Sequence, residues 1–182
     1  MEMLLGRRKA AQFLGLNPAQ KILDVATGTG TLANELAKLG HDVVGVDLSS
    51  SMVTVARDNY AKNPNLHFQQ ADATRLPFKS NEFDASAISF ALHDMPHDIE
   101  IKVLAEMKRV TKSDGHILVV DYSEPKNHWG ARLVSPLVRA AESIHWLPFV
   151  TRGLSNLLHE ANLQVSKQTT YLGIVQIVVV RN

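Results

Sequence analysis

The sequence predicts an α/β fold: a mostly parallel sheet of seven strands, with helices on both faces and an antiparallel hairpin at the C-terminal end. Five short apolar runs alternate with stretches of helical pattern between residues 22 and 121, which is typical of right-handed βαβ units. Two further apolar runs, joined at Gly173, indicate the hairpin. Because the chain has no linker, repeat or low-complexity tract, we expect a single domain over residues 1–182.

The strands are short apolar runs, as expected for a buried parallel sheet. They are predicted, in chain order, over residues 22–26, 43–47, 66–70, 83–89, 116–121, 164–171 and 174–180. The helices between them begin and end at residues with capping preferences, such as Ser49 or Ser50 at a start and Gly40 at an end. They are predicted over residues 3–14, 32–39, 96–110, 129–144 and 151–161, with one more helix that Ser49 or Ser50 caps and that carries Met52, Val53 and Ala56.

A glycine-rich loop follows the first strand and carries the strongest functional signal. Asp24 stands at the end of that strand, Gly28 and Gly30 follow, and Asp47 ends the next strand 19 residues after Gly28. This order is typical of a βαβ unit that binds a nucleoside. The two glycines allow a tight turn and a close approach of a ligand to the backbone.

Two classes of nucleoside ligand fit such a loop. The segment from Gly28 to Ala33 matches the G-x-G-x-x-A pattern of dinucleotide sites, although a lone match of this kind is weak evidence. Asp24 favours the other class, because its charge would repel a pyrophosphate at the helix N-terminus. S-adenosylmethionine (SAM) has no phosphate and carries a sulfonium and an α-ammonium, so an acid is favourable beside it.

The motifs resemble, in order, those of the class I SAM-dependent methyltransferases over roughly residues 8–180. Residues 24–30 resemble motif I of that family, with Ala26 where many members have a first glycine, and residues 71–78 resemble its D-A-x-x-L-P-F segment. Residues 83–90 and 106–121 resemble its fourth strand and its helix, turn and fifth strand. The amino acids at residues 7–10, 24–30 and 121–125 resemble the corresponding segments of the ubiquinone/menaquinone biosynthesis (methyltransferase type 11) group. Members of that group have a longer N-terminal segment.

This resemblance implies a Rossmann-like methyltransferase fold, SAM as cofactor, and a set of cofactor contacts. In the family, the acid at the position of Asp47 binds both ribose hydroxyls, and the acid at the position of Asp72 binds the adenine amino group. For Asp72 a cap on its own turn is the alternative. The predicted cofactor-binding residues are Asp24, Ala26, Thr27, Gly28, Thr29, Gly30, Asp47, Leu48, Met52, Asp72, Ala73 and Ser89.

His93 is the candidate catalytic residue. It follows the fourth strand, at the carboxyl edge of the sheet where ligands bind in open α/β folds, and histidine has an ordinary pKa of about 6.5. A base is needed only where the acceptor arrives protonated. The alternatives are an orienting contact to substrate or a polar loop residue beside Asp94. Asp121, which ends the fifth strand, is expected either to orient substrate or to bind backbone.

An apolar segment around residues 123–152 is the candidate substrate-contacting insertion. We expect a lid over a hydrophobic or aromatic small molecule, while helix packing, a dimer contact and a transient membrane contact are the alternatives. Arg132 and Arg139 also allow an acidic acceptor. The bulky residues are Trp129, Leu133, Leu137, Ile144, Trp146, Leu147 and Phe149.

Composition limits the remaining classes. Nineteen basic and 18 acidic residues among 182 leave no global field for nucleic acid, and the chain has no cysteine. We expect no metal site, no signal peptide and no stable membrane insertion, hence a cytoplasmic protein, as monomer or homodimer. The sequence favours a SAM-dependent methyltransferase of small molecules. A nicotinamide-dependent oxidoreductase and a non-catalytic SAM-binding protein are the alternatives.

Overall fold

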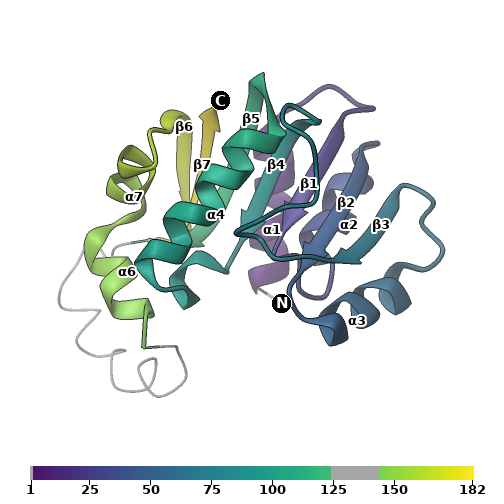
Figure 1. Ribbon diagram of the computed structural model, residues 1–182, viewed down its shortest axis with the longest axis horizontal. Helices are drawn as coiled ribbons and strands as arrows, with labels where there is room; N and C mark the ends of the chain where they lie inside the picture. Colours follow the sequence, from purple (N-terminus) through teal and green to yellow (C-terminus); the bar gives the residue numbers. More distant parts are fainter. Residues whose placement is uncertain (1, 124–143) are drawn as a thin grey trace.

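A seven-stranded sheet forms the centre of the molecule, and a computed structural model describes residues 2–123 and 144–182 (Figure 1). The strand order is β3-β2-β1-β4-β5-β7-β6. The first five strands are parallel, whereas β7 pairs antiparallel with both β5 and β6. The bounds are β1 Lys21–Val25, β2 Asp42–Asp47, β3 Leu66–Gln70, β4 Phe83–Ser89, β5 Thr111–Tyr122, β6 Gln164–Tyr171 and β7 Val175–Arg181. The predicted fold class, including the terminal hairpin, is confirmed.

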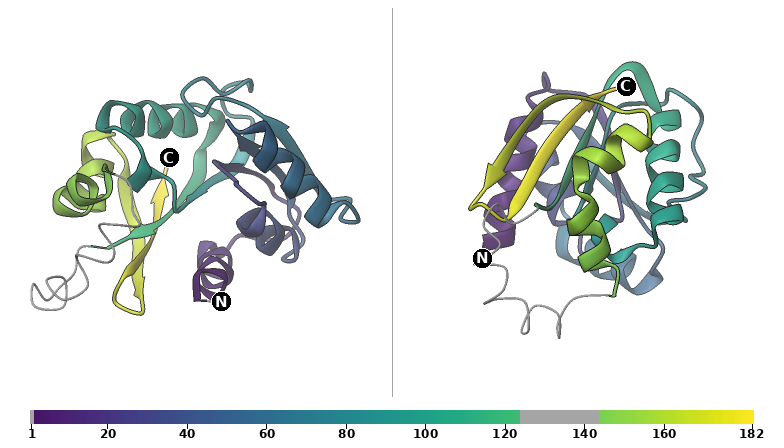
Figure 2. Two further views of the ribbon diagram at one scale, coloured as in Figure 1. Left: turned by 90° about the horizontal axis from the view of Figure 1, so that it is seen from below. Right: turned by 90° about the vertical axis from the view of Figure 1, so that its left-hand side faces the viewer.

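Helices cover both faces of this sheet, as Figure 2 shows. Three helices, α1, α2 and α3, pack on one face, and α4, α6 and α7 pack on the other. The helices are α1 Glu2–Leu14, α2 Thr31–Ala37, α3 Ser50–Tyr60, α4 His97–Val110, α6 Trp146–Arg152 and α7 Leu154–Glu160, with a short 3-10 helix, η1, at Leu92–Asp94.

The two cores follow from the alternation of side chains along each strand. In β1, Ile22 faces the core under α1 and α2, while Leu23 faces the core under α4. In β7, Ile177 faces the core under α1 and α2, and Val178 faces the core under α4. Each of these residues is at most 1% exposed, so the central strands are apolar on both faces, as a sheet covered on both sides requires, whereas the edge strand β6 is exposed.

The core face predicted for the helix after Pro96 is also confirmed. Val103, Met107 and Val110 of α4 are fully buried, and Ile99 packs against the same core at the edge of the buried region. Pro96 itself is the residue before the helix, because its backbone is extended rather than helical.

Two boundary predictions were wrong, and one local element was missed. A single helix over residues 151–161 was predicted, but the chain forms α6 and α7 with a break at Gly153, whose φ of 79° favours glycine. Strand β5 begins at Thr111, five residues earlier than predicted, because Thr111 already pairs with Phe83. The 3-10 helix η1 was not predicted. The helix predicted over residues 129–144 lies outside the described residues, apart from Ile144.

Candidate cofactor and active site

The glycine loop between β1 and α2 has the backbone shape that its sequence predicts. Gly28 and Gly30 have positive φ angles of 55° and 80°. A Cβ on Gly30 would lie 2.7 Å from Cζ of Phe68, so this position has no room for a side chain. A Cβ on Gly28 would meet nothing within 4 Å, so the backbone of Gly28 borders open space. The loop is therefore closed toward the protein at Gly30 and open for a ligand at Gly28.

Asp24 lies under this loop with one carboxylate oxygen unsatisfied. Its Oδ2 accepts hydrogen bonds from Oγ1 of Thr27 (2.6 Å) and from the backbone N–H of Ala33 (3.2 Å). Its Oδ1 is buried and has no partner among the described residues. Burial raises the pKa of Asp24 to about 7, although these hydrogen bonds and the nearby charge of Arg7 act in the opposite direction. An unpaired buried acceptor of this kind is suited to a cationic or hydrogen-bond-donating ligand.

Asp47 is held by the backbone at the end of β2. Its Oδ2 accepts from the N–H of Gly28 (2.8 Å), and its Oδ1 accepts from the N–H of Ser49 (2.9 Å). These bonds fix the carboxylate beside the open part of the loop, and each oxygen keeps a second lone pair for a ligand hydroxyl. Next to it, Leu48 and Met52 are 69% and 40% exposed, an unusual exposure for large apolar side chains that a flat ligand could cover.

Asp72 lies in an exposed turn after β3. Its Oδ1 accepts from both the N–H and the Oγ1 of Thr74, at 2.8 and 2.7 Å, and these bonds lower the pKa of Asp72. The turn-cap alternative is therefore realised. The Oδ2 atom takes no part in these bonds, so the adenine contact stays a prediction. Ala73 beside it and Ala26 in the first loop are partly buried against the core under α4, while Thr29 is exposed.

Arg7 of α1 reaches the same edge of the sheet, which the sequence reasoning missed. Its Nε donates to Oγ of Ser89 at 3.3 Å, and its guanidinium lies 5.1 Å from the centre of the Phe90 ring. Burial lowers the pKa of Arg7, while the charge of Asp24 acts in the opposite direction. The sequence holds no local signal for this contact, because 82 residues separate Arg7 from Ser89.

His93 forms a buried pair with Asp121, and the sequence had not joined these residues. Nδ1 of His93 lies 2.6 Å from Oδ1 of Asp121, and both side chains are at most 5% exposed. Three backbone N–H groups also donate to the Asp121 carboxylate, those of Leu92, His93 and Tyr122, at 3.1, 3.4 and 2.8 Å. Of the two expectations for Asp121, the binding of backbone is confirmed, and the orientation of substrate stays a prediction. Nε2 of His93 lies 3.3 Å from Oδ2 of the exposed Asp94.

Aromatic rings surround this pair. The Tyr122 ring packs edge-on against the His93 imidazole with 4.7 Å between ring centres, and Phe149 of α6 lies 6.3 Å away. Tyr122 also contacts Phe90 at 5.7 Å and Trp146 at 6.4 Å. Of the predicted substrate-contacting residues, Phe149 thus lies near His93, and Trp146 lies against Tyr122. By contrast, Ile144 and Leu147 are exposed, and Trp129, Leu133, Leu137, Arg132 and Arg139 lie outside the described residues.

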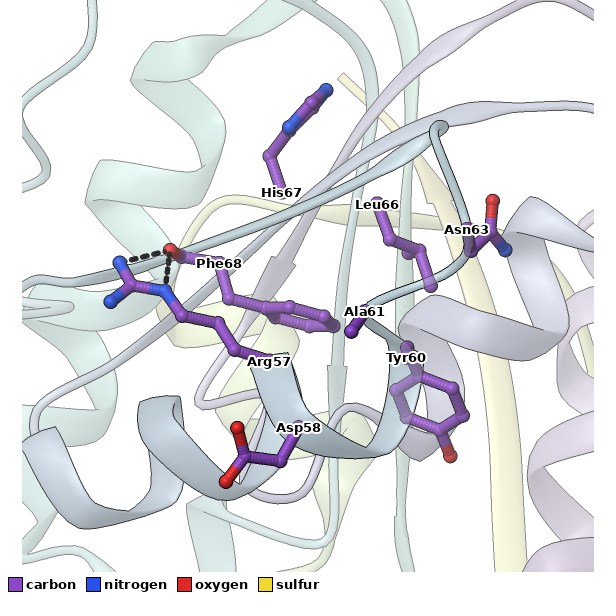
Figure 3. Close-up of a pocket in the computed structure, with 8 residues that line it drawn as sticks. All are labelled: Arg57, Asp58, Tyr60, Ala61, Asn63, Leu66, His67 and Phe68. Carbon is purple, nitrogen blue, oxygen red and sulfur yellow. Dashed lines mark hydrogen bonds between the residues drawn. The ribbon is translucent and has the colours of Figure 1, made fainter.

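A separate hollow of about 380 Å³ lies at the β3 edge of the sheet, against α3 (Figure 3). Arg57 crosses it, and its Nε and Nη2 donate to the carbonyl oxygen of Phe68 at 3.0 and 2.7 Å. Of the predicted site residues, none lines this hollow. Its link to the site is indirect, since the Phe68 ring is the one that backs Gly30.

Comparison with known proteins decides between the ligand classes that the sequence left open. Residues 22–115 match the model of a methyltransferase domain family, a segment that includes the glycine loop, Asp47, Asp72 and His93. The chain belongs to the SAM-dependent methyltransferases. The nicotinamide-dependent oxidoreductase is accordingly not favoured.

Curated relatives of this methyltransferase carry quinone-pathway names. A demethylmenaquinone methyltransferase of Renibacterium salmoninarum is 43% identical over 119 residues, which are 65% of this chain and 48% of that protein. One from Beutenbergia cavernae is 35% identical over 86% of this chain and 71% of its own length. A ubiquinone/menaquinone biosynthesis C-methyltransferase of Ectopseudomonas mendocina is 36% identical over 68% of this chain and 50% of its own length. The chain thus spans about half the length of several relatives that it matches.

Solved structures confirm the methyltransferase fold. A SAM-dependent methyltransferase from Aquifex aeolicus aligns with a TM-score of 0.69 over 96% of this chain and 88% of that chain, at 20% identity. An S-adenosylmethionine-dependent methyltransferase from Mesorhizobium loti aligns with a TM-score of 0.73 over 97% of this chain and 98% of that chain, at 15% identity.

The described residues hold neither a cluster of metal ligands nor a membrane-spanning helix. Over residues 2–123 and 144–182, no three histidine, aspartate or glutamate side chains are grouped so as to hold a metal ion. Within the same ranges, no helix has the length and apolarity needed to cross a bilayer.

Proposed function

We propose that this protein is an enzyme that transfers a methyl group from SAM to a small hydrophobic acceptor with an ionisable hydroxyl, such as a phenol or quinol. The single observation that carries the proposal is the buried His93–Asp121 pair, 2.6 Å apart, at the carboxyl edge of the sheet that also holds the glycine loop.

The residues of the glycine loop fit SAM. The open space at Gly28 and the unpaired Oδ1 of Asp24 suit the cationic methionine end of the cofactor. Asp47 would bind the ribose hydroxyls, with Leu48, Met52, Asp72 and Ala73 next to the adenine. When bound, SAM supplies a methyl group that its sulfonium already activates. The chain then has to hold the acceptor in line at near-attack distance, which is worth several kcal/mol of the barrier.

His93 would act as general base at Nε2. Asp121 accepts at the opposite nitrogen and so fixes the tautomer in which Nε2 carries the lone pair. An imidazolium formed by taking the acceptor's hydroxyl proton would be stabilised by the Asp121 carboxylate, as in other His–Asp pairs. The oxygen freed of its proton, or the ring carbon next to it, becomes the nucleophile that accepts the methyl group. Asp94, 3.3 Å from Nε2, has to give way to the acceptor, and its exposed position allows this.

The aromatic surroundings support an aromatic acceptor. Tyr122, Trp146 and Phe149 would pack on a planar ring and exclude water from the base. The curated relatives are named for demethylmenaquinone and ubiquinone, whose reduced forms are quinols. We also propose that residues 1–182 form one domain acting in the cytoplasm, with residues around 123–152 contacting the substrate.

A screen of acceptors tests this proposal. Release of S-adenosylhomocysteine from SAM is measured with panels of phenols, quinols, thiols, amines and lipids. We expect multiple turnovers with phenols or quinols, and loss of that turnover in His93→Ala. Binding of S-adenosylhomocysteine with no turnover on any panel would favour the non-catalytic alternative.

A further inference from the structure

Trp146 of α6 has an indole N–H that is buried and unused. Its Nε1 is shielded from solvent and takes part in no hydrogen bond within residues 2–123 and 144–182. The ring as a whole is only partly buried, and it packs against the apolar core under α4. An indole nitrogen donates but cannot accept, so only an oxygen or another acceptor atom that approaches it can satisfy it. A buried donor without a partner is unfavourable, which points to a ligand atom as the partner.

Trp146 belongs to the same aromatic cluster as the proposed base. Its ring meets the Tyr122 ring at 76° with 6.4 Å between the ring centres, and the Tyr122 ring in turn contacts the His93 imidazole at 4.7 Å. Trp146 and Phe149 are three residues apart in α6 and so lie on one face of that helix. Phe149 lies 6.3 Å from His93, and α6 packs on η1, the short helix that contains His93. The unused donor and the base are therefore parts of one cluster.

The indole N–H has the chemistry needed to recognise an oxygen of the acceptor. The proposed acceptor is an aromatic ring whose hydroxyl gives its proton to Nε2 of His93. A second oxygen on that ring, hydroxyl or carbonyl, has lone pairs for a neutral N–H donor. Apolar ligand sites commonly fix the orientation of the ligand with a few polar groups of this kind. An analogue that lacks the oxygen is rejected, because it leaves the buried donor unpaired.

We propose that Trp146 is a specificity-determining residue of the acceptor site: its N–H donates to a ring oxygen of the acceptor other than the one that His93 deprotonates. The inference rests on the proposed function, since it takes the same aromatic acceptor and the same base. Trp146 then selects, among aromatic acceptors of equal size, those that carry a second oxygen.

Two matched pairs of acceptors test this role. Hydroquinone is compared with para-cresol, and naphthohydroquinone with 4-methyl-1-naphthol, so that a methyl group replaces the second hydroxyl in each pair. Release of S-adenosylhomocysteine under anaerobic conditions gives kcat/KM for the wild type and for Trp146→Phe, which keeps an aromatic ring but has no N–H. In at least one pair, we expect the wild type to prefer the dihydroxy compound at least about tenfold. In Trp146→Phe, kcat/KM should fall about 10- to 100-fold for that compound and less than about threefold for its methyl analogue.

Ser155→Ala, at an exposed position of α7, is the control and should keep the wild-type preference. A wild type with no preference within either pair would overturn the proposal without any variant. An equal loss for both members of a pair in Trp146→Phe would also overturn it, because Trp146 would then act by packing alone. Unchanged kcat/KM for all four compounds in Trp146→Phe would show that the N–H is not used. A wild type that methylates no phenol or quinol would overturn the proposed acceptor class and this inference together.

Discussion

Nδ1 of His93 lies 2.6 Å from Oδ1 of Asp121, and both side chains are withdrawn from solvent. Asp121 accepts from three backbone N–H groups as well, so its carboxylate holds one position and orients the imidazole. This relationship fixes the orientation of the imidazole at the edge of the sheet, as the proposed role of His93 as a base requires.

Asp121→Asn should lower turnover by about 10²- to 10⁴-fold while leaving S-adenosylhomocysteine affinity within a few-fold of wild type. The amide can present its NH2 to Nδ1 and so reverse the tautomer, which removes the lone pair from Nε2. Steady-state kinetics with an active acceptor measures the turnover, and calorimetry with S-adenosylhomocysteine measures the affinity. His159→Ala, at an exposed position of α7, is the control. Wild-type turnover in Asp121→Asn would refute the base role.

Binding of S-adenosylhomocysteine should tighten as the pH rises from 6 to 8. The pKa of Asp24 is about 7 in the ligand-free fold because of its burial, and a bound ammonium favours the ionised carboxylate. Binding below pH 7 therefore releases a proton, and Kd should fall by up to about tenfold per pH unit until the carboxylate is ionised, after which it levels off. Calorimetry in two buffers of different ionisation enthalpy measures that proton. In Asp24→Asn the pH dependence should vanish, and an equally steep profile there would assign it to another group.

The same shift in Asp24 affects stability. A pKa raised in the folded state means that the fold binds more protons than the unfolded chain between about pH 4 and 7. The stabilisation from protonated Asp24 is complete below pH 4 and is lost as the pH rises through 7. Asp24→Asn should therefore raise the free energy of unfolding at pH 8 by about 1–3 kcal/mol and have little effect at pH 4. Urea unfolding at both pH values measures this. A lower stability of the variant at pH 8 would contradict the account.

Replacement of Gly30 should mainly lower stability, whereas replacement of Gly28 should mainly lower ligand affinity. Gly30→Ala places a Cβ 2.7 Å from Phe68 at a φ of 80°, so we expect a loss of about 2–4 kcal/mol in folding free energy. Gly28→Ala meets no atom within 4 Å and should cost only about 1 kcal/mol through its φ of 55°. Its Cβ would enter the ligand space, and S-adenosylhomocysteine affinity should fall at least about tenfold. Thermal unfolding and calorimetry separate the effects. Full affinity in Gly28→Ala would mean that the ligand does not approach this loop.

A cluster of charged side chains joins α6, the helix that contains Phe149, and α7 to α4. Arg152 of α6 pairs with Glu100, which is 1% exposed, and His97 bridges Glu100 and Glu160 at 3.0 Å each. Arg152→Ala leaves Glu100 buried with a weaker partner and should cost about 2–4 kcal/mol. Glu100→Gln in the same background should recover part of that loss, because it removes the buried charge. Urea unfolding of the single and double variants tests this, and additive effects would show that the pair does not interact.

The sequence predicted elements that depend on local pattern and missed contacts between distant segments. Alternation of apolar runs located all seven strands, and the turn at Gly173 predicted the antiparallel ending. The loop glycines were identified because left-handed backbone selects glycine. Arg7 and Ser89 are 82 residues apart, and His93 and Asp121 are 28 apart, so only the strand order β1-β4-β5 brings these groups to one edge. Ser89 was predicted at the site through the family resemblance, which gave no hint of its arginine partner.

The break between α6 and α7 is a second feature that depends on contacts between distant segments and that local sequence did not predict. Residues 151–161 have continuous helical propensity, yet the backbone at Gly153 turns to a φ of 79° and separates α6 from α7. Local sequence alone does not decide between a glycine tolerated within a helix and one that ends it. Packing decides it here, because Phe149 and Leu154 on either side both bury against the core under α4.

Calorimetric titration tests most directly whether the glycine loop and Asp47 bind SAM. The wild type and Asp47→Ala are titrated with S-adenosylhomocysteine, and the wild type is also titrated with NAD. We expect one-to-one binding of S-adenosylhomocysteine to the wild type and no binding of NAD. Binding to Asp47→Ala should be at least about 30-fold weaker, because two hydroxyl bonds to a carboxylate are lost. Binding of NAD without S-adenosylhomocysteine, or an Asp47→Ala variant with unchanged affinity, would contradict SAM binding at this loop.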